Sequence, residues 1–130
     1  MAHGTYSTEP PGEYLYGPSG ASSQTHTFVP GNGVTSISVC CISAGNPGSY
    51  SNRPAGCLAW ASNYTVVPGQ SYTVVVGGQG SAGSSTNPQR VGSYFVSTSE
   101  VYAQTAPAGN EAQYTVSPNA GTTRGGGTGG

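Results

Sequence analysis

Apolar and polar residues alternate with a period of two along several short stretches of this chain. The clearest stretch covers residues 34–43, in which Ile37, Val39 and Cys41 alternate with serines and Cys40. Successive side chains of a β-strand point to opposite faces of the sheet. The pattern therefore predicts a strand with Cys40 and Cys41 on opposite faces. Only one of the two can lie in a one-sided core, and we expect no bond between them.

Shorter runs rich in Val, Tyr and Thr, bounded by Gly, Pro, Asn or Ser, predict further strands. They cover residues 27–29, 57–61, 63–67, 71–77, 91–97, 100–103 and 113–116. No segment has the 3.6-residue period and the caps of a helix. The predicted fold is all-β, a small antiparallel β-sandwich over residues 25–117 with long Gly/Ser/Asn loops.

The tetrapeptide Val67-Pro68-Gly69-Gln70 has a specific turn preference. Proline at its second position and glycine at its third position satisfy the backbone angles of a type II turn. We expect this turn to join the flanking strands as a β-hairpin, although type II is not the favoured turn of two-residue hairpin loops.

The two ends of the chain differ from this body. Residues 1–24 are expected to form an extended arm, because several prolines and glycines prevent a helix there. Either the arm lies on a partner surface, as its aromatic side chains suggest, or it is a floppy tail. The candidate contacts are Tyr6, Tyr14, Leu15 and Tyr16. Residues 118–130, rich in Gly and Thr, are expected to form a flexible tail or a region that orders only against partners.

Charge is scarce, with three basic and four acidic residues and a net charge of -1. Binding to nucleic acid requires clustered Lys and Arg that neutralise phosphates, so we expect no nucleic-acid partner. No stretch approaches the roughly 18 apolar residues of a membrane helix, and residues 1–10 lack the features of a signal peptide. We therefore expect neither membrane insertion nor a cleaved leader.

The apolar content is also low, since only 18 of the 130 residues are Val, Leu, Ile or Phe. Ordering the backbone costs about 1–2 kcal/mol per residue, and glycine loses the most freedom on folding. We therefore expect the chain to depend on burial between subunits and to work as a homo-oligomer.

The three cysteines, Cys40, Cys41 and Cys57, are an odd number, whereas a disulfide framework normally uses an even one. Either all three are reduced and partly buried, or Cys57 pairs with one of the adjacent two, or a bridge joins subunits. The absence of CxxC spacing argues against zinc, and the absence of Asp argues against calcium. We expect no metal and no cofactor.

Groups for acid–base catalysis are few, because Glu100 and Glu111 are the only carboxylate side chains of the body. Residues 78–83 match GxGxxG, but a polar loop follows where a dinucleotide site needs a helix. We therefore expect no catalytic residues and no enzyme.

Loops rich in Tyr, Ser, Gly and Asn suit partner recognition, as in antibody paratopes. For Trp60 the alternative, that it fills the small core, is favoured. The candidate contacts to a receptor or partner are Tyr50, Arg53, Trp60 and Tyr94.

Several segments together are similar to one known family. They are Thr27-Phe28-Val29-Pro30 with Gly33-Val34-Thr35-Ser36-Ile37, the loop over residues 44–56 before Leu58-Ala59, and Val67-Pro68-Gly69-Gln70-Ser71-Tyr72-Thr73-Val74 with Val76-Gly77. Over about residues 25–105 the chain resembles the glycine-rich domain of bacteriophage and prophage tail fibres.

The resemblance implies a virion structural protein, assembled in the host cytoplasm and acting outside the cell as part of a tail fibre or appendage involved in host-surface attachment. It also implies a trimer, other virion proteins as partners of the arm over residues 1–24, and a surface polysaccharide or an outer-membrane protein as receptor. The alternative is a capsid or tail decoration protein that only binds neighbouring virion subunits.

Overall fold

The computed structural model describes residues 12–17, 22–45, 56–78, 92–104, 113–121 and 123–128. These residues form β1 (Gln24–Phe28), β2 (Ser36–Ile42), β3 (Cys57–Thr65), β4 (Tyr72–Val76), β5 (Ser93–Phe95), β6 (Val101–Gln104), β7 (Gln113–Val116), the 3₁₀ turn η1 (Pro118–Ala120) and β8 (Arg124–Thr128). The predicted all-β class is confirmed, because η1 is the only helical element within the described ranges.

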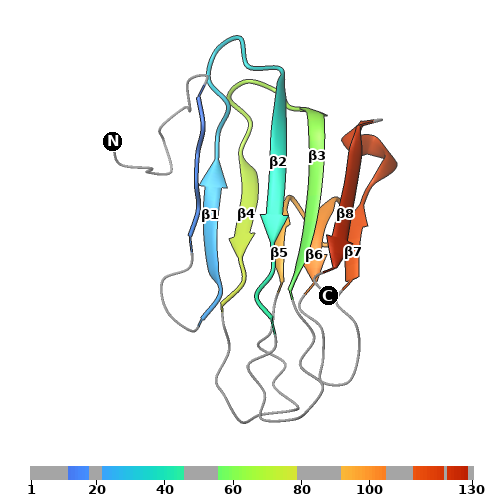
Figure 1. Ribbon diagram of the computed structural model, residues 1–130. Helices are drawn as coiled ribbons and strands as arrows, with labels where there is room; N and C mark the ends of the chain where they lie inside the picture. The colour runs from blue at the N-terminus through green and yellow to red at the C-terminus, as the bar shows by residue number, and fades with distance from the viewer. Residues whose placement is uncertain are drawn as a thin grey trace, which may run out of the picture.

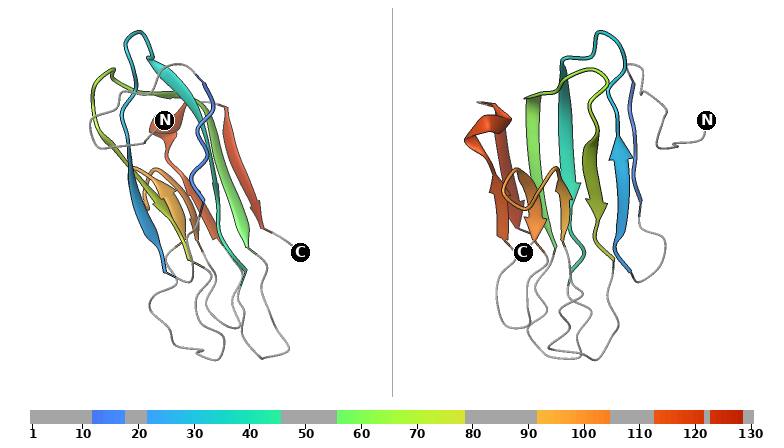
Figure 2. Two further views of the ribbon diagram at one scale, coloured as in Figure 1. Left: turned by 90° about the vertical axis from the view of Figure 1, so that its left-hand side faces the viewer. Right: turned by 180° about the vertical axis from the view of Figure 1, so that it is seen from behind.

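The strands form two antiparallel sheets of unequal size that face each other (Figure 1). The larger sheet has the order β1-β4-β5-β6-β7, and the smaller sheet has the order β2-β3-β8. β2 packs over β5 and β6, whereas β3 packs over β6 and β7. The two further views show the same offset, with β1 and β4 at the end of the larger sheet that extends past β2 (Figure 2).

Aromatic side chains from both sheets meet at Phe95, which is 3% exposed. The ring of Tyr64, from the smaller sheet, lies at right angles to it with the centroids 5.2 Å apart. Tyr72 stacks on Phe95 at 5.7 Å, and Phe28 meets it edge-on at 6.5 Å. These rings supply a large part of the apolar contact that the scarce aliphatic side chains cannot supply.

A β-bulge in β3 keeps the side chains on both sides of the bulge, including Ala61 and Tyr64, facing the core. Ile37 pairs with Tyr64 while Val39 pairs with Ala61, so β3 has one residue more than β2 over this interval. Asn63 takes up the extra residue with a φ of 66°, a left-handed conformation that Asn tolerates better than most residues. Because of the bulge, both Ala61 and Tyr64 are buried.

The turn at Pro68-Gly69 is present, but the predicted hairpin is wrong. Gly69 has a φ of 82°, and the Gln70 amide donates to the Val67 carbonyl oxygen at 3.1 Å. However, β3 pairs with β2 and β8, whereas β4 pairs with β1 and β5. The turn therefore crosses from one sheet to the other, which agrees with the poor fit of type II turns to tight hairpins.

The prediction of a flexible tail after residue 117 is wrong for Arg124–Thr128, which forms the edge strand β8. Its glycines pair with the first half of β3, from Leu58 opposite Gly127 to Trp60 opposite Gly125. Glycine carries no side-chain period from which this strand could be predicted. It fits here because side chains of neighbouring strands cover it, including the Trp60 ring over Gly125 and the Tyr114 ring over Gly126.

The cysteines follow the predicted alternation. Cys40 is exposed and Cys41 is buried, and Cys40, Cys41 and Cys57 are all free thiols. The two adjacent cysteines therefore lie on opposite faces of β2, and a bridge from Cys57 to either one is not formed.

Substitution of two neighbouring glycines tests whether β8 packs in the sandwich. A methyl group at Gly126 would lie 2.5 Å from the Leu58 carbonyl oxygen and from the Tyr114 ring, whereas one at Gly127 meets nothing within 4 Å. We expect Gly126→Ala to lower the free energy of unfolding by about 1–3 kcal/mol. Gly127→Ala, the matched control, should change it by less than about 0.5 kcal/mol. Equal effects in denaturant titrations would contradict the pairing of β8.

Candidate binding groove between the sheets

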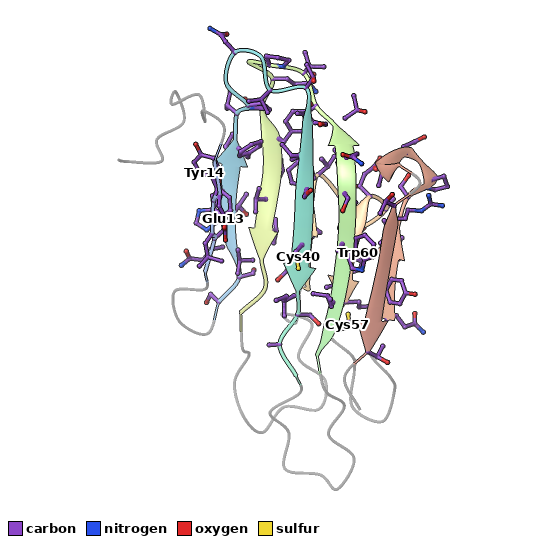
Figure 3. The ribbon with its side chains drawn as sticks, turned by 45° about the horizontal axis from the view of Figure 1, so that its top comes forward. Glu13, Tyr14, Cys40, Cys57 and Trp60 are labelled. Atoms are coloured by element: carbon purple, nitrogen blue, oxygen red, sulfur yellow. The ribbon has the colours of Figure 1, made fainter. Side chains whose placement is uncertain are left out.

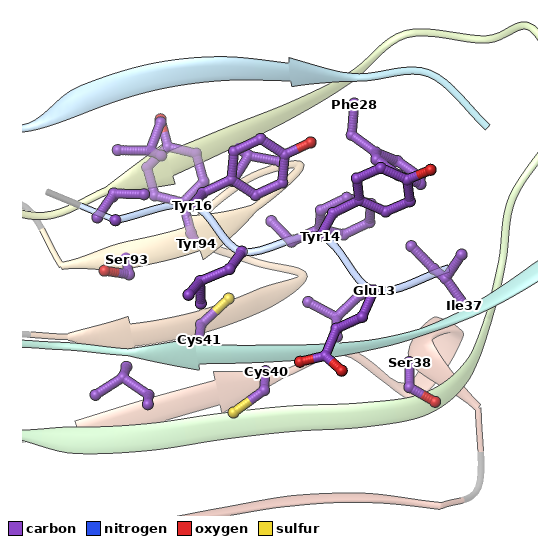
Figure 4. A pocket seen from close by; sticks show the side chains of 18 of the residues that line it. Glu13, Tyr14, Tyr16, Phe28, Ile37, Ser38, Cys40, Cys41, Ser93 and Tyr94 are labelled. Atoms are coloured by element: carbon purple, nitrogen blue, oxygen red, sulfur yellow. The ribbon is translucent and has the colours of Figure 1, made fainter. Parts of the chain in front are cut away.

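A groove of about 1120 Å³ opens where the larger sheet extends past β2. Its floor comes from β4 and β5, one wall is the inner side of β2, and the opposite wall is the segment over residues 12–17 (Figure 4). The apolar side chains among its lining residues include Tyr14, Tyr16, Phe28, Val34, Ile37, Val39, Cys41, Val74, Val76 and Phe95. The groove thus exists because the smaller sheet has no strand beyond β2 within the described residues.

The wall formed by β2 carries no charge. Ile37, Val39 and Cys41 face inward, as their alternating burial shows. The Cys41 thiol donates to the Val101 carbonyl oxygen across the sheets at 3.6 Å. Burial raises the pKa of Cys41 to about 12, so that this thiol is neutral at physiological pH. An apolar, uncharged wall of this kind suits an apolar segment.

The other wall is the described part of the arm, residues 12–17, which lies on its own chain. The ring of Tyr14 meets Phe28 edge-on at 5.9 Å, and the ring of Tyr16 lies 5.1 Å from His26. Leu15, between them, is 92% exposed. Of the four predicted arm contacts, two are therefore engaged in the same chain, Leu15 faces outward, and Tyr6 lies outside the described residues.

Both strands beside the groove are edges of their sheets. Among the described residues, β1 pairs only with β4, and β2 pairs only with β3. An edge strand presents main-chain N–H and C=O groups that another extended segment can bind. The groove therefore combines an apolar interior with the edges of β1 and β2, and residues 12–17 already run beside β1 as an extended segment (Figure 1).

The predicted receptor contacts do not converge. Tyr50 and Arg53 lie outside the described residues. Trp60 belongs to β3 of the smaller sheet, whereas Tyr94 belongs to β5 of the larger sheet and meets the Tyr102 ring edge-on at 6.2 Å. No common surface that includes both Trp60 and Tyr94 is formed within the described part of the chain.

Trp60 does not fill the core, so the favoured alternative is wrong. Its neighbours Ala59 and Ala61 are buried, and Trp60 alternates with them and is only half-buried. It pairs with Cys40 of β2 on the outer face of the smaller sheet (Figure 3). A neighbouring pair on the same face joins Leu58 to Ile42, which is 65% exposed. Cys40, Ile42, Leu58 and Trp60 are called the outer patch below.

Cys57 closes the opposite end of the sandwich. Its thiol donates to the carbonyl oxygens of Gln113 at 3.0 Å and Gln104 at 3.3 Å, both in the larger sheet. The hydroxyl of Ser43 accepts from the Cys57 amide at 2.9 Å and donates to the Gln104 carbonyl oxygen at 3.2 Å. These buried polar groups therefore join the sheets through hydrogen bonds, and the role of Cys57 is structural.

Metal-binding clusters and membrane-spanning helices are absent from the described residues. No group of three or more His, Cys, Asp or Glu side chains that could hold a metal ion occurs in the ranges that the structure covers. In the same ranges, no helix has the length and apolar character needed to span a membrane. The chain matches no protein-family model, no curated protein and no solved structure. The groove and the outer patch are thus the features on which a function can be argued.

The reactivity of the three thiols tests which of them are buried. We expect a thiol-alkylating reagent to modify Cys40 in the folded chain, and Cys41 and Cys57 only after unfolding, because the last two are buried. Partial burial raises the pKa of Cys40, so its thiolate is scarce at neutral pH and its reaction should accelerate as the pH rises.

The measurement is alkylation followed by peptide mass spectrometry, with Cys40→Ser as the control that should remove the fast reaction. Labelling of Cys41 in the folded chain at the rate of Cys40 would contradict the inward orientation of Cys41.

Proposed function

We propose that this chain is a non-enzymatic structural module of a bacteriophage tail fibre or related virion appendage that takes part in host-surface attachment. The module assembles with its neighbours through the groove beside β1 and β2. The observation that carries the assembly role is the apolar groove flanked by two strand edges. Such edges bind extended segments through the main chain, and the apolar interior selects their side chains.

The appendage role is supported by the contacts between the two segments that resemble the tail-fibre family, residues 27–37 and residues 67–77. The Gly69 amide donates to the Pro30 carbonyl oxygen at 2.9 Å, and the Val66 amide donates to the Thr35 carbonyl oxygen at 2.9 Å. Phe28 also pairs with Tyr72 in the larger sheet. The opening segment and the turn segment of the resemblance therefore form one corner of the sandwich, as parts of a single motif would.

A second candidate function is a decoration protein that holds neighbouring virion subunits together. The outer patch favours it, because a flat apolar surface with Ile42 65% exposed is suited to burial under a neighbouring subunit. The two functions differ in where the chain sits on the particle.

The test is mass spectrometry of gradient-purified particles from a lysed source culture, together with electron microscopy after labelling with an antibody to the folded chain. We expect the chain at a fixed ratio to other virion proteins, with the label on the tail or its fibres. Label over the capsid shell would replace the fibre role by the decoration role. Absence of the chain from particles would contradict both.

A further inference from the structure

The arm beside the groove behaves like a strand although it belongs to neither sheet. Over residues 12–17, Tyr14 and Tyr16 are half-buried, whereas Glu13 and Leu15 are exposed. This is the two-residue alternation of an extended segment with one face on a surface. The segment runs beside β1 (Figure 1) and outside both strand ladders. Two aromatic side chains are thus prominent among the contacts that attach it.

These contacts are of a kind that a second copy can provide. Tyr14 touches Phe28 and Tyr16 touches His26, so both anchors reach β1. The arm of any copy carries the same two tyrosines at the same spacing. Exchange of an identical segment between copies keeps every one of these contacts and alters only the connection.

A copy's own arm and the arm of a second copy compete for the same place on β1, and the outcome depends on the concentration of each arm at that place. Residues 18–23, which include Pro18 and Gly20, connect the arm to β1. A short connection gives the own arm an effective concentration in the millimolar range. Separate copies in dilute solution cannot compete with that, but copies held side by side in a particle can. The net charge of -1 adds little repulsion between them.

We propose that, where copies assemble, Tyr14 and Tyr16 of one copy replace those of a second copy against its Phe28 and His26, so that exchanged arms link neighbours. The inference rests on the proposed function, which brings the copies together. The groove wall over residues 12–17 is then supplied to each copy by another copy of this chain.

Photo-cross-linking of the full-length chain tests this exchange. Tyr14 is replaced by p-benzoylphenylalanine, an aromatic residue that cross-links to its neighbours under light, and heavy-isotope-labelled and unlabelled chains are mixed in equal amounts. Peptide mass spectrometry then separates cross-links within one copy from cross-links between copies. We expect the arm to cross-link to peptides of β1 and β2, with the between-copy share rising at least about tenfold from about 10 µM to about 1 mM protein.

The matched control carries the same replacement at Leu15, which borders the groove but whose side chain is 92% exposed, and should cross-link to β1 far less than the replacement at Tyr14. Melting curves of both variants verify that the chain is folded. If the groove cross-links stay within one copy at about 1 mM, or if between-copy cross-links map to other surfaces, the exchange is refuted. A chain found in purified particles whose arm stays on its own copy would refute the exchange while leaving the proposed function in place.

Discussion

The contact between Phe95 and the rings around it is the interaction on which the rest of the structure depends. Phe28 and Tyr72 come from the same sheet as Phe95, and Tyr64 comes from the opposite sheet. Aromatic pairs of this kind contribute about 0.5–1.5 kcal/mol each beyond the area they bury. In a chain with so few aliphatic side chains, this cluster holds a three-stranded sheet against a five-stranded one. The Asn63 bulge is required for it, because the bulge turns Tyr64 inward.

The difference in the number of strands between the two sheets explains both the groove and the position of the arm. A three-stranded sheet centred over β5 to β7 leaves the β1 side of the larger sheet without a covering strand. Exposed apolar surface at that edge is unfavourable, and the arm reduces it by placing Tyr14 and Tyr16 there. The arm attaches at the margin and leaves a groove of about 1120 Å³ beside β2. The proposed assembly through this groove relies on the same shortage of covering strands.

The parts of the fold that depend on local pattern could be predicted from the sequence. Period two located β2 and the opposite faces of Cys40 and Cys41, and the Pro68-Gly69 pair located a type II turn. The partners of each strand could not be predicted, since pairing is decided by contacts distant in sequence. The strand β8 has no side-chain pattern at all, and its order comes from neighbouring strands. In the candidate site, the sequence predicts that Tyr14 and Tyr16 contact a partner protein, which stays a prediction, and nothing in the sequence indicates that in this structure they contact β1 of the same chain.

The arm completes the sandwich through its half-buried tyrosines. This role is measured by the free energy of unfolding of Tyr14→Ala compared with Leu15→Ala, from denaturant titrations of the full-length chain. We predict a loss of about 1–2 kcal/mol for Tyr14→Ala, which removes a half-buried ring and its edge contact with Phe28. We predict a change below about 0.5 kcal/mol for Leu15→Ala, whose side chain is in solvent. Equal values for the two variants, or a larger loss for Leu15→Ala, would contradict this role of the arm.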